Sequence, residues 1–165
     1  MRRLRASRLV ISCMLVLAGS APALRAETPG ALDSLTVKEQ RALDARFVES
    51  HDQKSTDLLM SLFSESPNVF LIAPAGILFR GRKGVRDAVE AFFNSLEYIH
   101  GEIKDVSYLP AGDGVIGVGT VVFQRKPKGR PPEQKTVIWT DYRRREREKW
   151  VYVFRHAHWP LETRR

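Results

Sequence analysis

The residues best suited to chemistry lie near the end of the chain, in the run Arg155-His156-Ala157-His158-Trp159-Pro160. Histidine titrates near neutral pH, and a neighbouring carboxylate can fix its tautomer. We therefore expect His156, oriented by Asp141, to act as a general base or as a polar anchor. The alternative is a hydrogen-bonded structural His156 and an exposed Asp141.

The strand that carries His156 is predicted to present an aromatic face. Alternate side chains of a strand share a face. If a two-residue turn precedes this strand, Asp141 of the neighbouring strand lies on the same face as the histidines. A longer turn shifts the register by one residue and brings Thr140 and Tyr142 there instead. The expected wall suits a small apolar or aromatic molecule, unless it only fills the core. The predicted ligand contacts are Trp139, Tyr152, Phe154, His158 and Phe92.

Other candidate sites are less specific. His156 and His158 lack a third ligand at a recognisable spacing, so we predict no metal, and nothing in the sequence calls for a cofactor. The segment Arg80–Gly84 precedes a predicted helix but lacks P-loop spacing, and it is interpreted as a helix entry. The basic stretches Arg125–Lys135 and Arg143–Lys149 are interpreted as solvated turns.

The first 26 residues have the pattern of a secretory signal peptide. A basic start precedes the apolar stretch Leu9–Gly19, and the small residues Ala21-Pro22-Ala23 follow. The apolar stretch is too short for an ordinary membrane span. Cleavage is expected after Ala23 or Ala26. The sequence therefore predicts a secreted, periplasmic protein without a stable membrane anchor.

Removal of this segment changes the charge of the protein. Residues 1–26 contain five arginines and no acidic residue, which leaves 22 basic against 19 acidic residues and reduces the net charge from +8 to +3. The high isoelectric point is thus largely a property of the signal peptide, and we predict no nucleic-acid partner.

The hydrophobic pattern predicts three helices around a short hairpin. A capping box at Thr36-Val37-Lys38-Glu39 begins a helix that runs to about His51. Ser55 or Thr56 caps a second, shorter helix. A hairpin is expected over residues 69–79, and apolar residues at helical spacing predict a third helix over residues 85–96.

The remainder is predicted to be β-structure, which makes the fold class α+β. Strands are expected over residues 98–108 and 115–124, followed by a closing hairpin over residues 135–161. Loops are expected over residues 109–114 and 125–135. Gly117 and Gly119 indicate a bend or a close backbone approach.

This order of elements resembles the SnoaL-like branch of the nuclear transport factor 2-like superfamily. The resemblance rests on Arg80-Gly81-Arg82 before the third helix and on the spacing from Trp150 to His156. It implies a cone, in which a curved antiparallel (mixed) sheet packs on three N-terminal helices and leaves a pocket. The expected organisation is a signal peptide (1–26), a linker (27–35), the SnoaL-like domain (36–161) and a tail (162–165).

The resemblance implies binding, or cofactor-free acid-base conversion, of a small and largely apolar molecule. The alternative is a non-enzymatic dimerisation or protein-interaction module of the same fold. A homodimer through the sheet is expected, because members are commonly dimers. Neither the acid-base pair of ketosteroid isomerase nor the Asp-Arg-Asp set of the epoxide hydrolases is assigned to residues of this chain.

Overall fold

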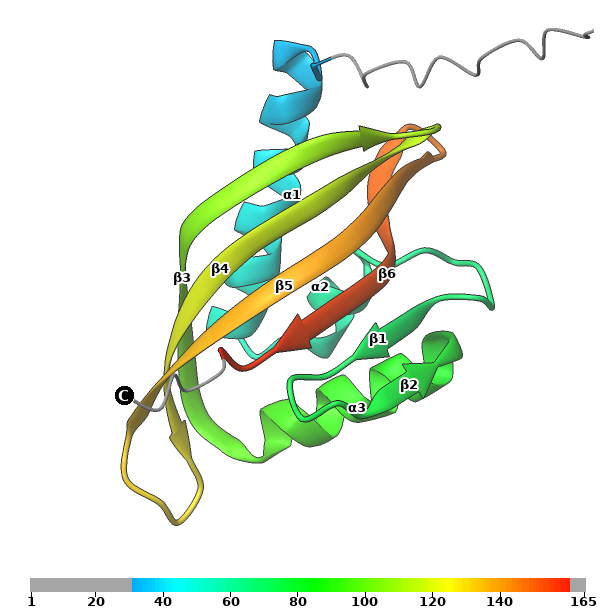
Figure 1. Ribbon diagram of the computed structural model, residues 1–165. Coiled ribbons are helices and arrows are strands. Elements are labelled where there is room, and N and C mark those ends of the chain that lie inside the picture. Colours follow the sequence, from blue (N-terminus) through cyan, green and yellow to red (C-terminus); the bar gives the residue numbers. More distant parts are fainter. Residues whose placement is uncertain (1–30, 161–165) are drawn as a thin grey trace, which may run out of the picture.

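The computed structural model describes residues 31–160. Its six-stranded sheet has the order β2-β1-β6-β5-β4-β3 and curves around helix α1 (Figure 1). The pairing of β1 with β6 is parallel, and the other pairings are antiparallel. The predicted α+β cone is therefore confirmed. The predicted signal peptide and tail, and the first part of the linker, lie outside the described residues.

Two helices open the described chain, α1 (Ser34–Asp52) and α2 (Thr56–Met60). The predicted capping box is wrong. Asp33 caps α1 instead, because its carboxylate accepts a hydrogen bond from the Thr36 amide at 2.8 Å. Glu39 accepts one from the Trp150 indole at 2.8 Å. The helix thus begins inside the predicted linker.

The α2 helix begins as predicted, with Ser55 as its cap. The short strands β1 (Phe70–Ile72) and β2 (Leu78–Arg80) form the expected hairpin, and α3 (Gly81–Asn94) follows at once. Arg82 of α3 donates hydrogen bonds to the carbonyls of Phe63 and Ser64. The Arg80-Gly81-Arg82 motif therefore ties the start of α3 to the segment that follows α2, which supports its interpretation as a helix entry.

Four long strands complete the fold: β3 (Leu96–Ala111), β4 (Gly114–Pro127), β5 (Glu133–Glu146) and β6 (Lys149–His158). The predicted loops are shorter than expected, because β3 and β4 meet at a tight turn and β4 and β5 extend into the second loop. Arg147 and Glu148 form the last turn with φ values of 47° and 66°. This two-residue turn agrees with the simpler of the two predicted geometries.

A β-bulge in the closing hairpin changes which side chains point inward. Arg143 pairs with Tyr152, but Tyr142 already pairs with Phe154, so Val153 is the extra residue. Beyond the bulge, Thr140 pairs with His156. The prediction of one continuous face from Trp150 to His158 is therefore wrong, because the bulge moves the histidines to the convex face of the sheet.

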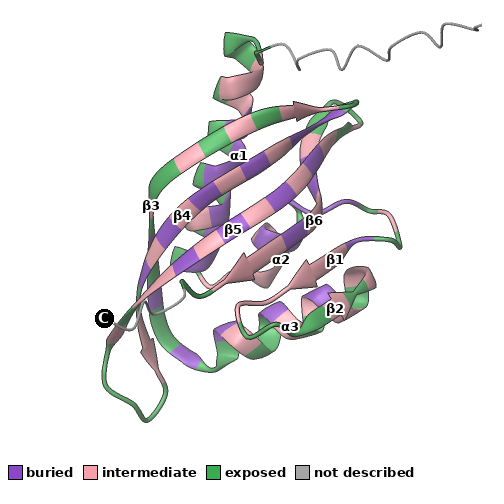
Figure 2. Ribbon diagram, in the orientation of Figure 1, coloured by how far each residue is buried: buried purple, intermediate pink, exposed green. Residues whose placement is uncertain are grey.

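The concave face of the sheet packs on the helices. Buried and partly exposed residues alternate along β4 and β5 (Figure 2). The core joins this face to α1, α2 and α3. Its largest buried apolar side chains include Phe47, Met60, Phe63, Phe93, Phe123, Trp139 and Tyr152. None of the helices between residues 31 and 160 has both the length and the apolar composition that a membrane span requires.

Two glycines of β4 allow the side chains of β5 to lie flat against the strand. A methyl group at Gly117 would lie 2.5 Å from Arg143 Nη2 and 2.6 Å from Asp141 Oδ1. At Gly119 it would lie 2.6 Å from the Trp139 ring. The close approach predicted for these glycines is therefore confirmed.

The substitution Gly117→Ala should destabilise the protein by about 1–3 kcal/mol, because the added methyl group overpacks a region that cannot move freely. Urea denaturation monitored by circular dichroism measures this loss. Gly84→Ala is the control, since a methyl group there meets no atom within 4 Å. Equal stabilities of the two variants would show that the close approach is not a packing constraint.

Candidate functional site

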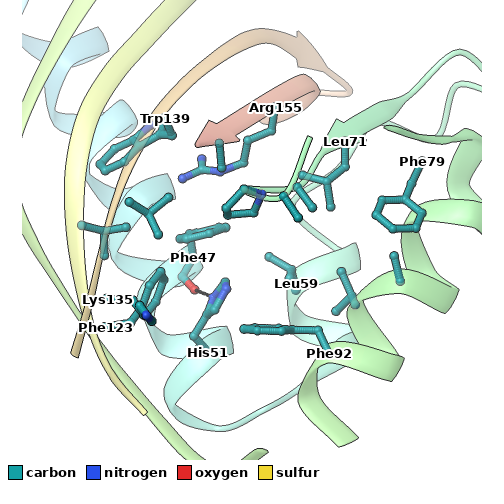
Figure 3. Close-up of a pocket in the computed structure, with 18 of the residues that line it drawn as sticks. Phe47, His51, Leu59, Leu71, Phe79, Phe92, Phe123, Lys135, Trp139 and Arg155 are labelled. Atoms are coloured by element: carbon teal, nitrogen blue, oxygen red, sulfur yellow. Dashed lines mark hydrogen bonds between the residues drawn. The ribbon is translucent and has the colours of Figure 1, made fainter. Parts of the chain in front are cut away.

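A cavity of about 320 Å³ lies between the concave face of the sheet and the helices (Figure 3). Helices α1 and α3, the β1–β2 hairpin and strands β4 to β6 all contribute to its wall. Most of the wall is apolar. Its apolar residues include Phe47, Leu59, Leu71, Phe79, Val89, Phe92, Val121, Phe123, Val137 and Trp139. The volume and lining are those of a small-molecule site, at the lower end of the usual range of about 300–1,000 Å³.

The structure brings only part of the predicted site together. Trp139 and Phe92 line the cavity, as expected. His156, His158 and Phe154 do not, because they follow the bulge and face the convex side. Their rings contact each other or the β1–β2 hairpin: the His156 and His158 centroids are 5.6 Å apart, and those of Phe154 and Phe70 are 4.6 Å apart. Tyr152 is fully buried beside the cavity.

Asp141 is not the partner of His156. Its carboxylate accepts hydrogen bonds from Arg143 Nε at 2.6 Å and from Arg155 Nη1 at 2.7 Å. Because Asp141 and His156 lie on opposite faces of the sheet, the predicted acid-base pair does not form. Arg155, which alternation along the strand places on the face opposite to His156, takes the inward position instead.

A chain of alternating charges runs through the core. Asp44 of α1 accepts a hydrogen bond from Arg143 Nη2 at 2.7 Å, and Arg143 also holds Asp141, which in turn holds Arg155. All four side chains are at most 4% exposed. Two cations balance two carboxylates, so the network is neutral, and each carboxylate is paired as burial requires.

This network contains an Asp-Arg-Asp set that the sequence did not reveal. The remaining lone pairs of Asp44 are used by the hydroxyls of Tyr108, at 2.6 Å, and Tyr152, at 3.1 Å. Burial raises the pKa of both tyrosines. Neither carboxylate lines the cavity. A second, more open hollow of about 400 Å³ touches Asp44 and Tyr108 from the other side, where the Asp44 oxygens are already occupied. The set therefore holds α1 against the sheet.

His51 is a polar group in the wall of the cavity. Its Nδ1–H donates a hydrogen bond to the Phe47 carbonyl at 2.8 Å, which leaves Nε2 as an acceptor. No described residue donates to Nε2. Burial, helped by the charge of Arg155 and opposed by the hydrogen bond to Phe47, lowers the pKa of His51 to about 4. His51 is therefore neutral at physiological pH.

Two further cations lie at the edge of the cavity. Arg125 pairs with Glu133 at 2.7 Å, and Lys135 pairs with the same carboxylate at 3.3 Å. The Arg125 guanidinium also lies 5.7 Å from the Trp159 ring centroid. All three of Arg125, Lys135 and Trp159 line the cavity. Within residues 31–160, no group of three His, Cys, Asp or Glu side chains is placed to hold a metal ion.

Sequence reasoning missed the inward position of Arg155 and the role of His51. The run from Val151 to Phe154 is apolar throughout, so apolar and polar residues do not alternate there. This lack of alternation was the feature of the sequence that is compatible with a bulge. His51 continues the helical stripe of Leu43 and Phe47, which marks it as inward-facing. Nothing in the local sequence indicates that α1 packs against β5.

Comparison with known proteins identified structural neighbours but no sequence relatives. No family model matches the chain, and no curated protein does. A candidate dehydratase of the NTF2-like family from Streptomyces avermitilis aligns with a TM-score of 0.69 and 22% identity, over 77% of this chain and 97% of its own. A candidate aromatic ring hydroxylase from Novosphingobium aromaticivorans gives 0.72 and 13%, over 79% and 93%.

A nuclear transport factor 2-like superfamily protein from Salmonella enterica aligns with a TM-score of 0.70 and 16% identity, over 79% of this chain and 96% of its own. These neighbours match along most of their length. Their TM-scores establish a common fold, and at such low sequence identities no activity carries over to this chain.

The stability of the protein should fall as the pH is lowered from 7 to 5, because the pKa of His51 is lower in the folded protein than in the unfolded chain. The unfolded chain binds a proton below about pH 6.5, whereas folded His51 binds one only near pH 4, so acid favours unfolding in this window. At pH 5 the expected cost is about 2 kcal/mol. Urea denaturation of the wild type and of His51→Gln at both pH values measures it.

The His51→Gln variant should lack this part of the pH dependence, whatever its stability at pH 7. His100→Gln serves as the control, because His100 is a surface residue that pairs with Asp52. A wild-type profile that matches that of His51→Gln would contradict the burial of a neutral His51.

Proposed function

We propose, from the premise that this chain has the nuclear transport factor 2-like fold, that it binds a small, largely apolar molecule in the cavity of the cone. The observation that carries the proposal is the cavity itself, whose wall is mostly aliphatic and aromatic. A few polar groups in such a wall fix the orientation of a ligand. Arg155 and His51 are suited to that role.

Binding is favoured over acid-base conversion by the chemistry of the wall. None of the described residues that line the cavity is an aspartate or a glutamate. Among the described lining residues, His51 has the side chain best suited to act as a base, but its pKa of about 4 makes it a weak one. The predicted catalytic pair of His156 and Asp141 is divided between two faces of the sheet. These observations support binding over proton transfer as the role of the cavity.

The substitution Ala88→Phe should abolish binding, because Ala88 lies in the cavity wall on α3 and a phenyl ring there occupies the ligand volume. We expect the affinity for 1-octanol, measured by isothermal titration calorimetry, to fall by at least about tenfold, or about 1.4 kcal/mol. Ala91→Phe is the matched control, since Ala91 is exposed on the same helix. Failure of the wild type to bind any apolar probe would refute the proposed function.

A second candidate function, self-association, is favoured by the convex face of the sheet. Its centre is formed by apolar and uncharged residues of three adjacent strands. They are Ile116, Val118, Thr120 and Val122 of β4, Thr136, Ile138, Thr140 and Tyr142 of β5, and Phe154, His156 and His158 of β6. None is Lys, Arg, Asp or Glu, in a chain with 28% charged residues.

A two-fold dimer brings the same patch of each subunit together, so a patch with net charge repels its own copy. The uncharged centre of this face is compatible with such pairing. We propose that a second copy of the chain covers it, which keeps the expected homodimer and the cavity as separate features on opposite sides of one sheet.

A lysine in the centre of this face should separate the two copies, because pairing would bury two like charges. Light scattering coupled to size-exclusion chromatography should give a dimer mass for the wild type and a monomer mass for Ile138→Lys. Leu35→Lys, at an exposed position of α1, should remain dimeric. A monomeric wild type would contradict the proposal, without bearing on the cavity.

A further inference from the structure

The ionisable residues that line the cavity are all basic. They are His51, Arg125, Lys135 and Arg155. Three carboxylates compensate these cations and the buried Arg143: Glu133 pairs with Arg125 and Lys135 at the edge, while Asp141 pairs with Arg155 and Asp44 with Arg143 in the core. Because His51 is neutral, four arginine and lysine side chains face three carboxylates. The site and its direct partners therefore have a net charge of +1 before a ligand enters.

Arg155 is the end of the buried charge chain that meets the cavity (Figure 3). Its side chain is 4% exposed, and Nη1 donates to Asp141 Oδ2 at 2.7 Å. Among the residues that the structure describes, Nε and Nη2 have no acceptor. A buried guanidinium with unused donors is costly unless an acceptor arrives. Arg155 therefore offers hydrogen-bond donors to whatever fills the cavity.

The position of Arg155 is fixed before a ligand binds. Its guanidinium carbon lies 3.8 Å from the ring centroid of Phe47 and 5.0 Å from that of Trp139. Asp141, held in turn by Arg143, prevents the group from turning away. Such a preorganised and poorly hydrated guanidinium matches the planar, two-oxygen geometry of a carboxylate.

The two cations at the edge of the cavity are weaker anchors. Arg125 and Lys135 share one carboxylate, and their side chains are 17% and 42% exposed. Water and salt screen such charges, and their pairs contribute little to binding. They contribute a positive potential at the edge, whereas the hydrogen bonds that orient a ligand come from Arg155.

We propose that the ligand of this cavity is an organic carboxylate, an aliphatic or aromatic acid whose carboxylate binds Arg155 and whose apolar part lies among Phe47, Leu71, Phe92 and Val137. This inference rests on the proposed function and adds the charge and the orientation of the ligand. The net charge of +1, which lies at the edge where Arg125 and Lys135 share Glu133, also favours an anionic ligand. A single acidic group fits, because one guanidinium has free donors.

The test compares three ligands with the same chain and different head groups, at pH 8 by isothermal titration calorimetry: octanoate, 1-octanol and octylammonium. Octanoate should bind at least about tenfold more tightly than 1-octanol, since a charge-assisted hydrogen bond contributes about 1.5–3 kcal/mol. Octylammonium should bind most weakly. Equal or weaker binding of octanoate than of 1-octanol overturns the inference and leaves the proposed function intact. Binding of none of the three refutes the proposed function itself.

Variants of Arg155 locate the carboxylate. Arg155→Met should lower the affinity for octanoate by at least about tenfold more than the affinity for 1-octanol, because hydrogen bonds to a charged acceptor are stronger than those to a neutral hydroxyl. A purely structural Arg155 would lower both affinities together. Arg155→Lys keeps the charge beside Asp141, and serves if the Met variant does not fold. It should bind octanoate about tenfold more weakly, because an ammonium lacks the planar pair of donors.

Arg125→Gln is the matched control at the edge of the cavity. It should change the affinity for octanoate by less than about threefold, as expected of a screened surface charge. A larger loss in Arg125→Gln than in Arg155→Lys would place the carboxylate at the edge and overturn the assignment to Arg155.

Discussion

The pairing of buried charges across the core is the interaction on which the rest of this structure depends. Asp44 of α1 and Asp141 of β5 are both held by Arg143, so the helix and the concave face of the sheet cannot shift independently. Each group is costly to bury alone and acceptable only in the complete set. The network therefore specifies one arrangement of α1 on the sheet, and Gly117 leaves the space in which it fits.

The cavity is a consequence of this arrangement. The charge network occupies one part of the concave face, and the cavity lies beside it, where the aromatic side chains of α1, α3 and the sheet do not fill the cone. Arg155 belongs to both regions, since it pairs with Asp141 and faces the cavity. The same guanidinium that pairs with Asp141 in the core therefore also lines the cavity. An apolar wall with one fixed guanidinium suits a binding site better than a site for proton transfer.

The two faces of the sheet carry different side chains. Trp139, Asp141 and Arg143 point into the cone, while the alternating residues Thr140 and Tyr142 point outward with His156 and Phe154. The concave side contains the cavity for which we propose a small-molecule ligand, and the convex side contains the uncharged surface for which we propose a second copy. The structural neighbours share the fold without defining either use. Histidines that were predicted for catalysis belong to the external surface.

The sequence by itself determined the fold class, the order of the elements, the helix that carries Phe92 and the close approach at Gly117, because these follow from local periodicity and glycine placement. Only the tertiary structure decided the site. A single extra residue at Val153 reverses the inward face of β6 and exchanges His156 for Arg155, and the pairing of Arg143 with Asp44 joins residues 99 positions apart. Both depend on how distant segments pack, and alternation along one strand contains no information about that packing.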